Sequence, residues 1–168
     1  IETMAGRLAT KVRGERVTIQ MPEPTELRPE VALDVDHQRL RLGVVNTGVP
    51  HVVIPVTDLE EVEVERVGRQ VRFHPAFQPR GTNVDFISVP DAHVPFVELR
   101  VFERGVEGET WSCGTGVAAV AWACQSFFGW KERVSIRTKG GEHQVRWDAQ
   151  GALWYSGEIV LCFSGELA

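Results

Sequence analysis

The 168-residue sequence lacks a long uninterrupted apolar run. Its most hydrophobic stretch, Val117–Phe128, is interrupted by alanine, cysteine and glutamine and is much shorter than the roughly 20 residues of a membrane-spanning helix. We therefore expect no membrane segment, and we interpret this stretch as a buried helix.

Positive charge is also scarce. The formal net charge is -5, which argues against non-specific nucleic-acid binding, because that needs a basic face. Only three of the 18 lysine and arginine residues are lysine. The arginine bias suits recognition of carboxylates, whose geometry matches the guanidinium group. A GC-rich coding sequence explains the same bias equally well.

Cysteine occurs only as Cys113, Cys124 and Cys162. Their spacing contains no CxxC pair and no zinc pattern, so we expect no metal site. An odd number at irregular spacing does not indicate a disulfide framework. We therefore expect free thiols and a cytoplasmic protein.

Most of the chain has the pattern of short strands. A hairpin is predicted around Arg13-Gly14, ending at Met21-Pro-Glu-Pro, and Thr25–Glu30 is predicted as a loop. Leu59–Val67 fits a short helix or a strand, and both interpretations stay open. The expected strands are Arg7–Val12, Arg16–Met21, Gln38–Val45, Val52–Val56, Asn83–Val89, Phe96–Phe102, Val134–Thr138, His143–Trp147, Leu153–Tyr155 and Glu158–Phe163.

The one convincing helix is Gly116–Phe128, followed by Gly129 as a C-terminal cap. It is apolar on nearly every face, so it must be buried on nearly every face. The predicted fold class is α/β in the α+β sense, with a mixed or antiparallel sheet wrapped around one central buried helix.

Cys113 lies directly before this helix, in the segment Ser-Cys-Gly-Thr-Gly. Unpaired backbone N–H groups and the positive end of the helix dipole gather there. Both favour a thiolate and an anionic ligand such as a carboxylate. Nucleophilic attack and general acid/base catalysis are both compatible with this setting. Burial as a small apolar residue explains Cys124 and Cys162 better than it explains Cys113.

Three segments together resemble diaminopimelate epimerases. One is the second catalytic segment, Glu103-Arg-Gly…Gly-Glu-Thr-x-x-Cys-Gly-Thr-Gly. The others are Asn46-Thr-Gly-Val-Pro-His-Val-Val and Arg80-Gly-Thr-Asn-Val-Asp-Phe, in the family's order. Met21-Pro-Glu-Pro and Gly140-Gly also fit, so the resemblance covers essentially the whole chain.

The resemblance implies epimerisation of LL- to meso-diaminopimelate by two cysteines, without pyridoxal phosphate or metal. Cys113 corresponds to the second cysteine. His51 and Glu103 correspond to residues that influence thiol protonation. The residues implied in substrate binding are Asn83, Glu103, Arg104, Gly114 and Thr115. Taken singly, Asn83 could cap a turn, His51 could begin a strand, and Glu103 and Arg104 could be a solvated pair.

Two departures from the family pattern concern the site. Val49 stands where many members have a substrate-binding asparagine, and we hypothesise that Asn46 takes over its contact. Glu107 is an extra residue, which we expect to lengthen a loop without moving Cys113.

The resemblance also implies that the family's N-terminal half, with the first catalytic cysteine, is absent from this sequence. Residues 1–13 would then be the end of that half or a linking hairpin, 14–157 the C-terminal epimerase domain, and 158–168 a final strand that crosses to the absent half. We expect the chain alone not to epimerise, and an exposed apolar edge could drive homodimerisation. The alternatives are a proline racemase-like enzyme and a truncated, inactive structural or binding module. A phenazine-type isomerase would replace the thiol altogether.

Overall fold

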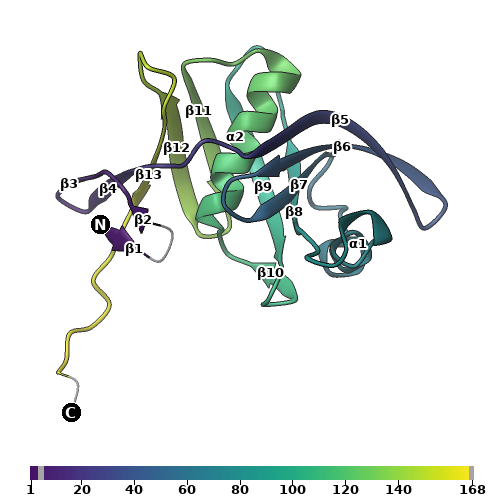
Figure 1. Ribbon diagram of the computed structural model, residues 1–168, viewed down its shortest axis with the longest axis horizontal. Coiled ribbons are helices and arrows are strands. Elements are labelled where there is room, and N and C mark those ends of the chain that lie inside the picture. The colour runs from purple at the N-terminus through teal and green to yellow at the C-terminus, as the bar shows by residue number, and fades with distance from the viewer. Residues whose placement is uncertain (4–5, 167–168) are drawn as a thin grey trace.

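The computed structural model describes residues 1–3 and 6–166 and consists of a strongly curved sheet around a central helix (Figure 1). The two α-helices in this described part are α1 (Val64–Arg72) and α2 (Gly114–Phe128). A short 3-10 helix covers Pro75–Phe77. The strands are β1 (Glu2–Thr3), β2 (Gly6–Arg7), β3 (Thr10–Arg13), β4 (Arg16–Gln20), β5 (Glu26–Val35), β6 (Gln38–Asn46), β7 (Pro50–Pro55), β8 (Asn83–Ser88), β9 (Phe96–Glu103), β10 (Gly108–Thr110), β11 (Arg133–Thr138), β12 (Gly141–Trp147) and β13 (Leu153–Glu158).

Eleven of the strands described form one sheet in the order β3-β4-β13-β12-β11-β9-β8-β7-β6-β5, with β10 paired to β9. Neighbours are antiparallel except for β7 with β8 and β9 with β11. Each parallel pair is joined by a helical crossover, α1 in the first case and α2 in the second. The predicted fold class, a mixed sheet wrapped around a central buried helix, is confirmed.

The central helix begins at Gly114, two residues earlier than expected, and ends at Gly129, whose φ of 73° gives the left-handed cap. A second helix, α1, forms as well, and it overlaps the segment Leu59–Val67, for which a helix and a strand both stayed open. Its buried residues Val64, Gly68 and Val71 recur at helical spacing. The valine–glutamate alternation that suggested a strand continues into the first turn of α1.

The prediction of a loop at Thr25–Glu30 is wrong. Glu26 begins the long edge strand β5, which pairs antiparallel with β6. The register shifts between Arg28 and Val31, so Pro29 lies in a bulge. A proline without an N–H is tolerated at such a bulge and on an edge strand.

The last expected strand, Glu158–Phe163, does not form. The sheet ends at Glu158 with β13, and residues 159–166 have no regular structure, forming a tail that leaves the body of the molecule (Figure 1). Its side chains Val160, Leu161 and Phe163 are exposed. The proposed division at 1–13, 14–157 and 158–168 stays a prediction, and residues 4–5 and 167–168 lie outside the described part.

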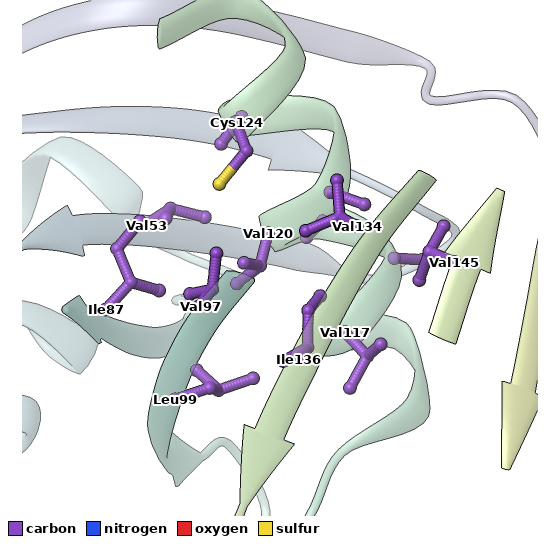
Figure 2. Packing of buried hydrophobic residues seen from close by; sticks show 14 of the residues in the cluster. Val53, Ile87, Val97, Leu99, Val117, Val120, Cys124, Val134, Ile136 and Val145 are labelled. Atoms are coloured by element: carbon purple, nitrogen blue, oxygen red, sulfur yellow. The ribbon is translucent and has the colours of Figure 1, made fainter. Parts of the chain in front are cut away.

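Two apolar cores pack on opposite faces of the sheet. Successive residues of a strand point to opposite faces, so Val53 packs against α2, whereas Val52 and Ile54 pack on the side of α1. Figure 2 shows the first core, in which Val120 and Cys124 of α2 face the strands. No helix of the described residues is long and apolar enough to cross a membrane.

Candidate active site

Cys113 is the residue immediately before α2, in extended conformation. It is half-buried, and its Sγ lies 3.3 Å from the Thr115 hydroxyl. The backbone N–H of Gly116 also donates toward this thiol. The first amides of a helix have no partner within the helix, so this end can also receive an anionic ligand.

The net shift of the pKa of Cys113 is upward, contrary to the expectation from the sequence, because other effects outweigh the helix terminus. Burial raises the pKa of Cys113, and the negative charges of Asp85 and Glu103 raise it further. The hydrogen bond between Cys113 and the Thr115 hydroxyl and the one from the Gly116 N–H lower the pKa, but they do not compensate for the loss of solvation. The thiol is therefore protonated at neutral pH.

His51 and Asp85 lie against Cys113 from neighbouring parallel strands, β7 and β8. Both side chains are completely buried, and His51 Nδ1 lies 2.8 Å from Asp85 Oδ2. The other ring nitrogen, Nε2, lies 3.0 Å from the Thr115 hydroxyl. The structure thus brings His51, Thr115 and Cys113 together as the sequence predicts, and adds Asp85, which the sequence analysis missed. The available signal was a charged residue within a wholly buried strand.

Gly116 has a packing role in this arrangement. A Cβ at this position would lie 2.7 Å from Asp85 Oδ1 and 3.4 Å from the His51 ring. Gly114 differs, since a Cβ there would meet no atom within 4 Å. Gly116 thus lets the helix approach the buried pair, whereas Gly114 leaves open space beside the thiol.

Asn83 organises the neighbouring backbone. Its side-chain amide donates to the Pro50 carbonyl at 3.0 Å, and its Oδ1 accepts from the Arg104 backbone N–H at 2.9 Å. The guanidinium of Arg104 donates to the Arg80 carbonyl. Glu103 accepts a short hydrogen bond from the Thr110 hydroxyl. These residues lie near the same ends of the central strands, where β7 and β8 begin and β9 ends.

Asn46 is the last residue of β6, and its Oδ1 accepts the Gly48 N–H at 3.1 Å in the turn that leads to β7. Thr47, which the sequence analysis missed, donates its hydroxyl to the Thr115 carbonyl at 3.1 Å. This bond fastens the turn to the first turn of α2. Glu107 lies in the β9–β10 turn, where it accepts from Arg72 and from the Gly105 N–H.

A second polar cluster supports Ser112, the neighbour of Cys113. His143 Nε2 lies 3.0 Å from both the Ser112 and Thr138 hydroxyls, and its Nδ1 lies 3.1 Å from the Tyr155 hydroxyl. Burial lowers the pKa of His143 and raises that of Tyr155. The described residues contain no group of three or more histidine, cysteine, aspartate or glutamate side chains placed to hold a metal ion.

The family profile described as Diaminopimelate epimerase matches residues 43–162, a range that contains the whole site. The diaminopimelate epimerase of Aquifex aeolicus is 41% identical over 146 residues, covering 84% of this chain. The chain belongs to the diaminopimelate epimerase family. It spans about half the length of the curated relatives it matches, since the aligned region is 50% of the Aquifex protein.

Solved structures share the fold at low sequence identity. A predicted epimerase from Pseudomonas aeruginosa is similar over 96% of this chain and 62% of its own, with a TM-score of 0.62 and 16% identity. A phenazine biosynthesis protein of the PhzF family from Bacillus anthracis covers 92% of this chain and 63% of its own, with a TM-score of 0.58 and 15% identity. At such identities the likeness concerns the fold alone.

Proposed function

We propose that this chain is one half of an amino-acid epimerase in which Cys113 exchanges a proton with the substrate α-carbon. The observation that carries the proposal is the position of the thiol. It lies at the start of α2, beside the first amides of the helix and 3.3 Å from a hydroxyl that also contacts a buried histidine. A carboxylate held by those amides would bring its α-carbon to the thiol.

The proposed substrate is diaminopimelate, interconverted between its LL and meso forms in bacterial lysine and peptidoglycan synthesis. The names of the relatives support this choice. Gly114 and Thr115 would bind the α-carboxylate, and the open space at Gly114 supports that role. Asn83, Glu103 and Arg104 would hold the rest of the substrate. His51 and Glu103 would influence the protonation of the thiols, and the proposed reaction uses no cofactor.

Inversion needs an acid/base group on each face of the α-carbon. Cys124, on α2, is completely buried in the core (Figure 2). Cys162 lies in the exposed tail. We therefore propose that the opposing cysteine belongs to a second half that completes the enzyme, and that residues 1–168 alone do not epimerise. A measurable inversion rate from the isolated chain would refute this point.

The proposal extends to Asn46, which would replace the asparagine that many members have at the position of Val49. Its side chain lies in the turn that Thr47 fastens to α2. In the completed enzyme, Asn46→Ala should weaken substrate binding. An unchanged KM and kcat would refute this role.

We also propose a cytoplasmic location and an assembly through the exposed tail. The free thiols favour a reducing, cytoplasmic environment. The exposed apolar tail favours either contact with the completing half or homodimerisation.

The decisive experiment uses the full reading frame that contains this segment. α-Proton exchange and inversion of LL-diaminopimelate would be followed in D2O for the wild type, Cys113→Ala and Cys113→Ser. We expect inversion in the wild type and its loss in both variants while folding is retained. A folded full-length protein that does not turn over diaminopimelate would overturn the substrate, and proline would be tested next.

A further inference from the structure

Glu107, the extra residue in the turn between β9 and β10, has an unusual backbone conformation. Its φ is 61°, in the left-handed region that residues with a side chain rarely adopt. Its N–H donates to the Glu103 carbonyl at 2.8 Å and closes the turn. Its Oε1 accepts the Gly105 N–H at 3.0 Å, so the side chain folds back over its own turn. Such strain persists only where surrounding contacts hold it, and it is frequent at functional sites.

Arg72, the last residue of α1, supplies a contact that holds this turn. Its Nε and Nη2 donate to Glu107 Oε1 at 3.2 and 2.9 Å. The two side chains are largely shielded from solvent, at 13% and 31% exposure. Burial opposes ionisation of Glu107. The hydrogen bonds from the Gly105 N–H and from Arg72, with the positive charges of Arg72 and Arg69, outweigh burial, so the pKa of this carboxyl lies below its ordinary value. The ion pair is therefore present at neutral pH.

The same guanidinium lies against the segment that precedes β8. A Cβ on Gly81 would collide with Arg72 Nη1, so the absence of a side chain there makes room for the guanidinium. Two residues later, Asn83 begins β8, and its Oδ1 accepts the Arg104 N–H at 2.9 Å. The Arg104 guanidinium donates to the Arg80 carbonyl at 3.1 Å. Arg72 thus contacts both segments that carry these two side chains.

We propose that Arg72 and Glu107 are positioning residues that hold the turn at Arg104 against Asn83, and so fix the relative geometry of two side chains that hold the substrate. The part of this inference that concerns the substrate rests on the proposed function. Glu107 acts on Arg104 through the backbone of the turn, and Arg72 acts on Asn83 through the backbone beside Gly81. Neither residue of the pair has to touch the substrate.

Stability alone does not explain the pair. Glu107 Oε2 is buried without a hydrogen-bond partner among the described residues, which is costly. Removing an ion pair from water adds a further cost, and apolar side chains of similar volume often give a more stable protein. The left-handed backbone of Glu107 adds strain to these costs. A fixed geometry of the turn accounts for all three features.

The rest of the hairpin is held independently of this pair. Glu65, in the first turn of α1, accepts the Glu109 N–H at 2.8 Å. Glu103 accepts a hydrogen bond from the Thr110 hydroxyl, and β9 pairs with β10 along the whole of β10. Loss of the Glu107 carboxylate should therefore loosen the turn and leave the Glu103 side chain in place.

The first test measures amide hydrogen exchange at Arg104 by NMR in this chain, without substrate. In Glu107→Ala this amide should exchange at least about tenfold faster, whereas the amides of β8 should exchange as in the wild type. Glu107→Gln retains an oxygen that can accept from Arg72 and Gly105, so it should retain most of the protection. Arg66→Ala, the matched control, removes exposed ion pairs of the same helix and should change nothing at Arg104. Unchanged exchange in Glu107→Ala, or equal acceleration of all amides, would overturn the proposal.

The second test measures the kinetics of LL-diaminopimelate epimerisation by the completed enzyme. Glu107→Ala and Arg72→Ala should each raise KM about tenfold and change kcat less than about threefold, because they weaken binding and leave Cys113 untouched. A pair that only stabilises the fold would lower the amount of active enzyme, so the apparent kcat would fall at unchanged KM. That result would overturn the role in substrate binding. A wild type without turnover would refute the proposed function, and the exchange at Arg104 would still decide whether the pair holds the turn.

Discussion

Gly116 lies where three chemically important side chains meet. Its missing Cβ leaves room for the Asp85 carboxylate, the His51 ring and the Cys113 side chain, the last at 3.3 Å from the ideal Cβ position. A single methyl group in this position would have to displace a buried carboxylate or move the start of α2.

Gly116→Ala should therefore destabilise the protein by about 1–3 kcal/mol, the usual cost of overpacking a dense site. Gly114→Ala is the matched control in the same helical turn, because its Cβ meets open space, and it should change the unfolding free energy by less than about 0.5 kcal/mol. Urea unfolding of both variants measures the difference. Equal stabilities would show that α2 can shift freely at this end.

The buried thiol of Cys124 leads to a prediction about how the stability of the protein depends on pH. Burial raises the pKa of this thiol to about 12, from an ordinary value of 9.0. Below pH 9 the thiol is protonated in both the folded and the unfolded chain, so burial of the neutral thiol stabilises the folded chain to its full extent. Above that pH only the unfolded chain releases the proton, and stability falls by about 1.4 kcal/mol per pH unit until the folded pKa is reached.

Cys124→Ala removes this titration. Its stability deficit relative to the wild type, measured by urea unfolding, should shrink by about 1 kcal/mol between pH 9 and pH 10. A deficit that stays constant over this interval would mean that the folded protein accommodates the thiolate.

Most of the candidate site could be predicted from the sequence, because Cys113, Thr115, His51 and Asn83 lie within contiguous motifs. Asp85 lies within one of these motifs too, but its contact with His51 could not be predicted, since it depends on the parallel pairing of β7 with β8. The acidity of Cys113 was predicted with the wrong sign, because the burial of the thiol and the approach of Asp85 are properties of the packed site.

At the scale of elements, α1 shows why local sequence patterns were insufficient to predict every helix. The helix packs so closely on β9 that a Cβ on Gly68 would lie 2.6 Å from the Phe102 Cβ. A glycine in mid-helix lowers helix propensity, and the valine–glutamate alternation before it fitted a strand equally well. The same glycine is what permits the packing. The strands, whose alternation is independent of such contacts, were predicted more accurately.

Gly68→Ala should destabilise the protein by about 1–3 kcal/mol despite the better helix propensity of alanine, because the methyl group overlaps Phe102. Gln70→Ala, at an exposed position of the same helix, should cost less than about 0.5 kcal/mol. Thermal and urea unfolding would both report the difference. A stabilised Gly68→Ala variant would mean that α1 can move away from the sheet.

At the scale of the whole molecule, the chain continues beyond β13, its last strand, as an exposed apolar tail. Leu161 is 84% exposed and Phe163 is 86% exposed, values unusual for side chains of this size. The predicted strand at this end did not form. A strand needs hydrogen-bonding partners, and among the described residues the last backbone hydrogen bond of this segment is the one from the Ile159 N–H to the Glu15 carbonyl.

The double variant Leu161→Ser and Phe163→Ser should keep the unfolding free energy within about 0.5 kcal/mol and reduce self-association, measured by sedimentation velocity at several concentrations. Leu153→Ser, in the buried part of β13, is the contrasting control and should lose several kcal/mol. If the double variant associates as strongly as the wild type, the tail is not the contact surface.

The placement of one core on each face of the sheet has a consequence for local opening. Strands β7 and β8 lie between the two cores, and every residue of β8 is buried. Their amide hydrogens should therefore exchange with solvent more slowly than those of the peripheral β3–β4 hairpin. His51 and Asp85 sit on these slowly opening strands, so they would keep their relative geometry while the edges of the sheet fray. The thiol is connected to them by the first turn of α2, and any adjustment on ligand binding would then take place in that turn.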